Sequence, residues 1–186
     1  MARYPGFAFQ PQRFTRADGL SMNYLDEGPR TGEAVLMLHG NPSWSWYWRH
    51  LVVGLSEHRR CIAPDWIGMG GSDKPGDDRY RYTLASRIDD LEQLYQHLVR
   101  ERGLPATGLT LAVHDWGGMI GLAWAVQHPE RVARLVITNT AGFTNPKGQR
   151  LPWALRLGRD SALGALLIRG FNAFAGGATR MATVKP

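Results

Sequence analysis

Residues 111–118 read Leu111-Ala112-Val113-His114-Asp115-Trp116-Gly117-Gly118. An apolar run typical of a buried strand leads through reactive side chains into two glycines that begin a helical pattern. This order is typical of a nucleophile elbow, a strained strand-to-helix turn that holds one side chain above the sheet. It predicts that Asp115 is a covalent nucleophile whose ionised form the helix N-terminus stabilises. Aspartate is also a common helix N-cap, and the stretch alone leaves that interpretation open.

Strand-like and helix-like runs alternate on both sides of the elbow. Strands are expected at 22–27, 34–38, 61–64, 109–113 and 132–140, and helices at 46–55, from 83 onward, and at 117–127. This alternation predicts an α/β fold with a doubly wound, mostly parallel sheet. After Gly142 the pattern becomes helical, at 153–157 and at 160–174, where Asp160 is a candidate N-cap. The sequence therefore predicts two parts, residues 1–142 and 143–186.

Charge and composition narrow the class of protein. The 186 residues are 44% hydrophobic and 20% charged, which excludes a disordered chain. The net charge of +6 lies after Gly142, where seven basic residues face only Asp160. Contact of this basic tail with an acidic partner or a membrane surface is one interpretation. A solvated helical face is favoured, and no nucleic-acid partner is expected, because basic and aromatic residues do not interleave.

Several other features limit location and chemistry. No stretch is long and apolar enough to span a bilayer, and no signal peptide is recognisable, so the cytoplasm is the expected location. The single cysteine, Cys61, opens a strand-like run and is interpreted as a small core residue. The glycine-rich segment Asp65–Pro75 lacks the spacing of a nucleotide loop and is expected to be a packed surface loop. The sequence indicates neither a metal site nor a cofactor.

A second motif, His39-Gly40-Asn41-Pro42, directly follows the strand at 34–38. In a fold with such an elbow, this loop and the residue after the nucleophile supply the backbone amides of an oxyanion hole. Here those amides belong to Asn41 and Trp116. His39 is interpreted as a structural histidine that ties the loop by hydrogen bonds. Asn41 taken alone is equally compatible with a turn before Pro42.

These segments together resemble a known family. His39–Pro42, Asp65–Pro75 and Val113–Gly118 occur in this order and spacing in haloalkane dehalogenases of the α/β-hydrolase fold, and the resemblance covers nearly the whole chain. Through residues 20–29 and 41–45 the chain is most similar to the dehalogenase-like β-lactone decarboxylases of bacterial long-chain olefin biosynthesis. Epoxide hydrolases share the His-Asp-Trp-Gly elbow but more often carry an aromatic residue in place of Asn41.

The resemblance implies a chemistry for each residue of the site. Asp115 would displace halide from a haloalkane, or open a β-lactone that leaves as CO2 and an alkene, through a covalent ester. The side-chain amide of Asn41 and the indole N–H of Trp116 would hold the leaving group, although the Trp116 ring could also pack against a cap. The substrate would be small and hydrophobic. Assembly with other enzymes of a hydrocarbon pathway is a further implication, as is membrane-surface contact through the basic tail.

The residues that would release the product are not evident. Such folds resolve the ester with a histidine backed by an acid. Only His128 follows Asp115, and it reads as a structural residue at a helix end; Asn139 stands where some dehalogenases carry a glutamate. The acid, the histidine and the last core strands are therefore expected after residue 186. Residues 143–186 are expected to form the start of a helical cap, and this chain alone is expected to be inactive. A relative that only binds a partner and keeps the elbow as a structural turn is the alternative from another class.

Overall fold

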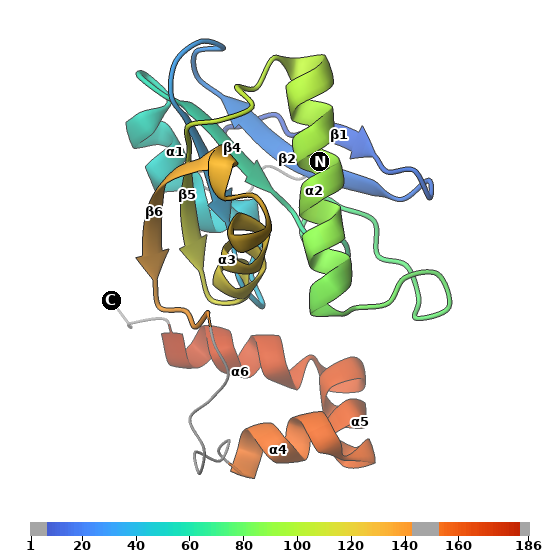
Figure 1. The fold of residues 1–186 in the computed structure, drawn as a ribbon. Helices are drawn as coiled ribbons and strands as arrows, with labels where there is room; N and C mark the ends of the chain where they lie inside the picture. Colours follow the sequence, from blue (N-terminus) through green and yellow to red (C-terminus); the bar gives the residue numbers. More distant parts are fainter. Residues whose placement is uncertain (1–6, 143–152, 183–186) are drawn as a thin grey trace. The chain divides into compact units, whose positions relative to one another are not determined.

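The computed structural model describes residues 7–142 and 153–182 (Figure 1). The chain divides into two compact units, Met1–Phe143 and Thr144–Pro186.

The first unit is built on one mixed sheet. Its strands are β1 (Gln12–Thr15), β2 (Ser21–Glu27), β3 (Ala34–Leu38), β4 (Arg60–Pro64), β5 (Leu109–His114) and β6 (Val132–Thr138). They lie in the order β1-β2-β4-β3-β5-β6, with β4, β3, β5 and β6 parallel and β1 and β2 antiparallel to their neighbours. The predicted α/β fold with a mostly parallel sheet is confirmed. Strand β1 was not predicted, because four residues that include two polar and one charged side chain give no apolar signal.

Helices cover both faces of this sheet. On one face, α2 (Leu84–Arg102) and α3 (Trp116–Gln127) pack against the core that contains Leu36 and Leu38 of β3. On the other, η1 (Ser45–Trp48) and α1 (Arg49–Leu55) pack against Val35 and Met37 of the same strand. Successive residues of a strand point to opposite faces, so a strand buried on both sides is apolar throughout. A short turn, η2 (Pro129–Arg131), joins α3 to β6.

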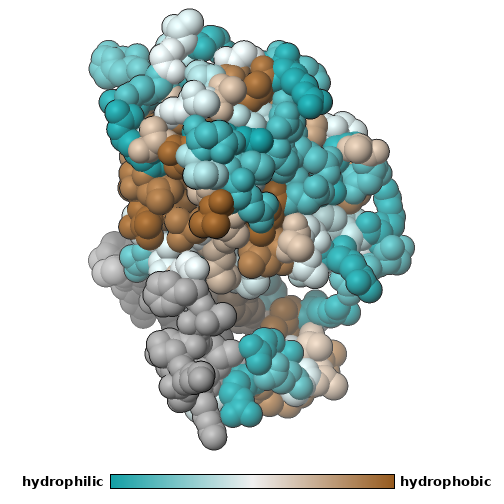
Figure 2. Space-filling view, viewed as in Figure 1, coloured by the Kyte–Doolittle hydropathy of each residue, from teal (hydrophilic) through white to brown (hydrophobic). Residues whose placement is uncertain are grey.

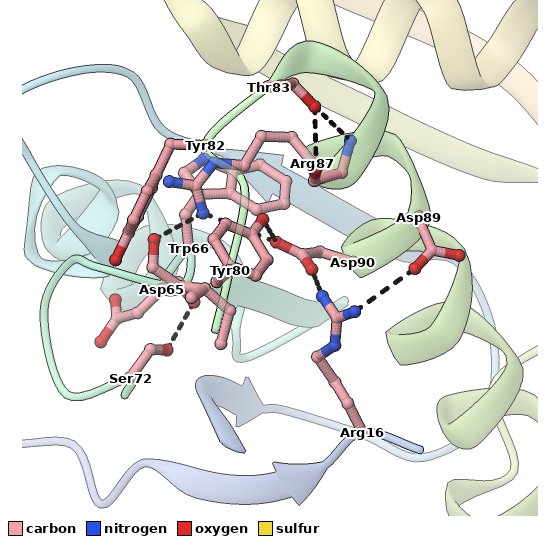
Figure 3. A network of polar contacts seen from close by, with 12 residues as sticks. Arg16, Asp65, Trp66, Ser72, Tyr80, Tyr82, Thr83, Arg87, Asp89 and Asp90 are labelled. Carbon is pink, nitrogen blue, oxygen red and sulfur yellow. Dashed lines mark hydrogen bonds and ion pairs between the residues drawn. The ribbon is translucent and has the colours of Figure 1, made fainter. Parts of the chain in front are cut away.

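A buried ionic network joins α2 to the hairpin formed by β1 and β2 (Figure 3). The Asp90 carboxylate is fully buried, accepts a 2.6 Å hydrogen bond from the Tyr80 hydroxyl, and pairs with Arg16 and Arg87. Arg87 also donates to the backbone carbonyl of Ile67. A buried carboxylate is tolerated where such donors surround it.

The last strand of the sheet, β6, presents an apolar edge. Leu135, Val136 and Ile137 are 46%, 48% and 54% exposed, and among the described strands only β5 pairs with β6. Figure 2 shows an apolar patch over this side of the first unit. An unpaired apolar edge strand is a template for pairing with another chain.

One helix prediction for the second unit is wrong. The run at 160–174, expected as one helix capped by Asp160, is split between α5 (Ala162–Phe171) and α6 (Ala173–Ala182), after α4 (Trp153–Asp160). Ser161 caps α5 by accepting from the N–H of Gly164, while Asp160 ends α4 and pairs with Arg159. Asn172, at φ +51°, then interrupts the helix, because asparagine tolerates the left-handed conformation that ends helices.

Candidate active site

The elbow places Asp115 at the carboxyl end of β5. Asp115 has φ +51° and ψ −126°, a backbone conformation that residues other than glycine rarely adopt. Added side chains at Gly117 and Gly118 would overlap the backbone of Leu38 and the side chain of Thr140, so the close approach requires glycine there. The Asp115 side chain makes no capping hydrogen bond to α3. Asp115 thus occupies the N-cap position of α3, but its carboxylate does not cap the helix.

The loop after β3 reaches the same point from the neighbouring strand. Leu38 is in register with Val113 in the parallel pair β3–β5, so both loops leave the same edge of the sheet. The backbone N–H of Asn41 donates a 2.8 Å hydrogen bond to Oδ1 of Asp115. The second oxygen, Oδ2, accepts no hydrogen bond from any described residue.

Both residues predicted to donate to the leaving group are accessible: Asn41 is on the loop whose N–H contacts this carboxylate, and Trp116 directly follows Asp115 in the chain. Asn41 is exposed, and Trp116, the first residue of α3, is 42% exposed. Within the described residues, neither the side-chain amide of Asn41 nor the Trp116 indole N–H donates a hydrogen bond to the protein. Both can therefore serve a ligand, and their role in catalysis remains a prediction.

His39 has the structural role that its sequence context indicates. Its Nδ1 lies 2.8 Å from the Gly40 carbonyl and its Nε2 accepts from the N–H of Trp66 at 3.3 Å, which fixes the proton on Nδ1. Burial lowers the pKa of His39 to about 4. A buried, neutral ring with both nitrogens engaged is not available as a general base.

None of the histidines in the described segments hydrogen-bonds to Asp115. His128 lies 3.4 Å from Glu92 at the end of α3, in agreement with a structural role. Asn139 follows β6 with φ +39°, and its backbone carbonyl accepts the N–H of Asp115 at 3.3 Å, while the residue itself is exposed. It thus supports the elbow through its main chain.

Two features of the site were not predicted. The Tyr47 ring stacks on the His114 ring with centroids 4.5 Å apart. The pKa of Tyr47 is raised mainly by burial and to a smaller extent by the charge of Asp115. Asp65 and Trp66, in the glycine-rich segment, are both 1% exposed and bond to the loop that carries Asn41. The expected surface loop is thus buried at its start. An aspartate that follows a buried strand was the only sequence signal for this contact.

Other predictions concern residues away from the elbow. Cys61 is fully buried among apolar side chains, and burial raises the pKa of its thiol to about 11, as suits a core residue. No cluster of three or more metal-ligating side chains occurs within residues 7–142 and 153–182. Of the helices described, none has the length and apolar character needed to cross a membrane.

Comparison with known proteins decides the family. A family model described as alpha/beta hydrolase fold matches residues 33–177. The chain belongs to the α/β-hydrolase fold family. Within this family, it is 56% identical over 181 residues to a cis-3-alkyl-4-alkyloxetan-2-one decarboxylase of Xanthomonas campestris, covering 95% of this chain and 59% of the relative. It is 40% identical over 136 residues to a haloalkane dehalogenase of Mycolicibacterium paratuberculosis, covering 72% of this chain and 42% of that protein.

The chain is also similar to a solved structure that is reported under epoxide hydrolases. A structure reported under novel epoxide hydrolases in metagenomes from hot environments aligns with a TM-score of 0.72 and 31% identity, over 88% of this chain and 55% of that one. The predicted resemblance to dehalogenase-like and decarboxylase α/β-hydrolases is confirmed by the two sequence relatives. The chain spans between two fifths and three fifths of the length of these proteins.

Proposed function

We propose that this α/β-hydrolase belongs to an enzyme in which Asp115 forms a covalent ester with a hydrophobic substrate, and that the substrate is a β-lactone with two alkyl substituents. The observation that carries the proposal is the state of the Asp115 carboxylate. Oδ1 is held by the Asn41 N–H at 2.8 Å, and Oδ2 has no partner among the described residues. One oxygen is thus oriented and the other is free to attack.

The reaction can be written in two steps, ring opening and loss of CO2. In the first, Oδ2 attacks the alkyl carbon bonded to the ring oxygen, and the bond between that carbon and the ring oxygen breaks. The ring opens to a carboxylate, and Asp115 carries the alkyl group as an ester. The side-chain amide of Asn41 and the indole N–H of Trp116 are the donors for the new carboxylate.

In the second step the substrate carboxylate leaves as CO2. The electron pair of the broken carbon–carbon bond forms the alkene, and the bond between the alkyl carbon and Oδ2 breaks. Asp115 returns as a carboxylate, so the lactone becomes an alkene and CO2 without a water molecule. The decarboxylase relative, 56% identical, is named for a cis-3-alkyl-4-alkyloxetan-2-one, which supports this substrate class.

Dehalogenation is the second candidate, because the same two neutral donors suit a leaving halide and the dehalogenase relative is 40% identical. In that reaction the ester requires hydrolysis. Epoxide opening is the third candidate, and the solved epoxide hydrolase structure supports it.

One experiment separates these reactions. The full-length protein is incubated with a cis-dialkyl β-lactone, a long-chain bromoalkane and an aryl epoxide, and alkene, bromide and diol are measured. We expect alkene from the lactone, and loss of that activity in Asp115→Asn. If the folded protein forms none of the three products, the proposal is wrong and a binding role is favoured. If Asp115→Asn retains the activity, Asp115 is not the nucleophile and the proposed mechanism is wrong.

A further inference from the structure

The loop that carries Asn41 is held at both ends by two consecutive residues. At its start, the indole N–H of Trp66 donates to the His39 carbonyl at 2.9 Å, and the Trp66 backbone N–H donates to the His39 ring. At its end, the N–H of Ser45 donates to Oδ1 of Asp65 at 2.8 Å. Asn41 lies between these anchors.

The anchors are themselves fixed in the core of the first unit. Oδ2 of Asp65 accepts a 2.8 Å hydrogen bond from the N–H of Gly71. The carbonyl of Ile67, the residue after Trp66, accepts a hydrogen bond from the Arg87 guanidinium. Figure 3 draws Asp65, Trp66 and Arg87 within one network of polar contacts. Buried, fully engaged groups of this kind restrict the movement of the segments that they join.

We propose that Trp66 is a positioning residue of the reaction, which, with Asp65, fixes the Asn41 loop so that the Asn41 N–H orients the Asp115 carboxylate. The inference rests on the proposed function, because it assigns Trp66 to the step in which Oδ2 attacks. Trp66 touches the nucleophile only through His39 and the loop. Small displacements of a group that orients a nucleophile reduce the rate strongly, which is why such a group needs a rigid support.

The chain offers a matched control in Trp124. Its ring is fully buried and its indole N–H donates to Glu92 at 2.7 Å. Its ring lies against Tyr95, His128 and the Arg131 guanidinium, all outside the Asn41 loop. Replacement of either tryptophan by phenylalanine removes one hydrogen bond of a buried indole and a similar volume, so a purely structural effect should be similar in the two variants.

The test compares Trp66→Phe and Trp124→Phe in the full-length protein by two measurements. The first is exchange of the Asn41 backbone amide with deuterium, followed by NMR. The second is the single-turnover rate of ester formation on Asp115 with a cis-dialkyl β-lactone, followed by mass spectrometry of the protein. We expect Trp66→Phe to speed the exchange and slow the ester formation by about tenfold each, the effect of one lost hydrogen bond. Trp124→Phe should leave both unchanged, although both variants lose thermal stability.

Equal effects of the two substitutions on both measurements, or no effect of Trp66→Phe on the amide exchange, would overturn the inference. If Trp66→Phe does not fold, Asp65→Asn decides the question in the same way. Its amide can accept only one of the two backbone hydrogen bonds of Asp65 while keeping the size of the side chain. If the wild type forms no ester, the proposed function fails, but the exchange data still show whether Trp66 positions the loop.

Discussion

The backbone N–H of Asn41 and Oδ1 of Asp115 are 2.8 Å apart, and this contact joins two loops separated by 74 residues. The hydrogen bond assigns different roles to the two carboxylate oxygens. It also places the Asn41 main-chain N–H on the proposed nucleophile itself, whereas the sequence predicted that this N–H binds a substrate oxyanion. In the proposed ester of Asp115, the same N–H would polarise the carbonyl oxygen and so favour attack by water where the ester is hydrolysed.

The contact predicts a strong effect of Gly40→Ala. The added methyl group would overlap the side chain of Asp115. We expect ester formation to slow by about 100-fold, as for a nucleophile displaced by about 1 Å. The control is Gly54→Ala in α1, where nothing lies within 4 Å of the added carbon. That variant should keep full activity and gain up to about 1 kcal/mol in free energy of unfolding. Equal activities of the two variants, measured as alkene release, would contradict this reading of the loop.

The buried His39 predicts a pH dependence of stability. Its pKa is about 4 in the folded protein and about 6.5 in the unfolded chain, because burial disfavours the charged ring. Between these values the unfolded state binds a proton that the folded state does not bind, so stability decreases as the pH falls. The contribution of His39 is about 3 kcal/mol over this window. Urea unfolding from pH 7 to pH 4 measures it, and NMR of the His39 ring gives the titration directly. A ring that titrates near pH 6.5 would disprove the assignment.

The features that could be predicted are those encoded by residues close together in the sequence. The elbow combines an apolar strand, Asp115 and two glycines in one short run, and the role of His39 followed from its place after a strand. The hydrogen bonds by which Asp65 and Trp66 hold the Asn41 loop were not predicted, because they join residues 20 and 27 positions apart and their partners are backbone groups. The break at Asn172 was missed for another reason. Asparagine is compatible with both a helix interior and a left-handed end, and only the packing of the helices selects between them.

Two adjacent arginines on β4 and just before it give a matched test of buried and exposed ion pairs. Arg60 is 1% exposed and donates two hydrogen bonds to the buried Asp26, whereas Arg59 pairs with Glu33 at the surface. Burial alone would raise the pKa of Asp26, but hydrogen bonds from Arg60 and Arg30 hold it below its usual value. We expect Arg60→Met to lower the free energy of unfolding by about 3 kcal/mol, since it leaves a buried carboxylate with less compensation. Arg59→Met should change it by less than about 1 kcal/mol, and similar losses in urea unfolding would be inconsistent with the buried pair.

Isotope labelling distinguishes the two fates of the ester on Asp115. With a bromoalkane, hydrolysis by water attack on the ester carbonyl leaves one oxygen from the solvent in the carboxylate. With a β-lactone, departure of CO2 expels the carboxylate intact, and no solvent oxygen enters. In water enriched in oxygen-18, multiple turnovers of the lactone should therefore leave the peptide that contains Asp115 unlabelled, whereas any turnover of the bromoalkane should label it, as measured by mass spectrometry. The unreacted protein, kept for the same time in the same water, gives the background. Label from the lactone reaction at the level of the bromoalkane reaction would show that both esters are hydrolysed, and that the alkene does not arise by expulsion of Asp115.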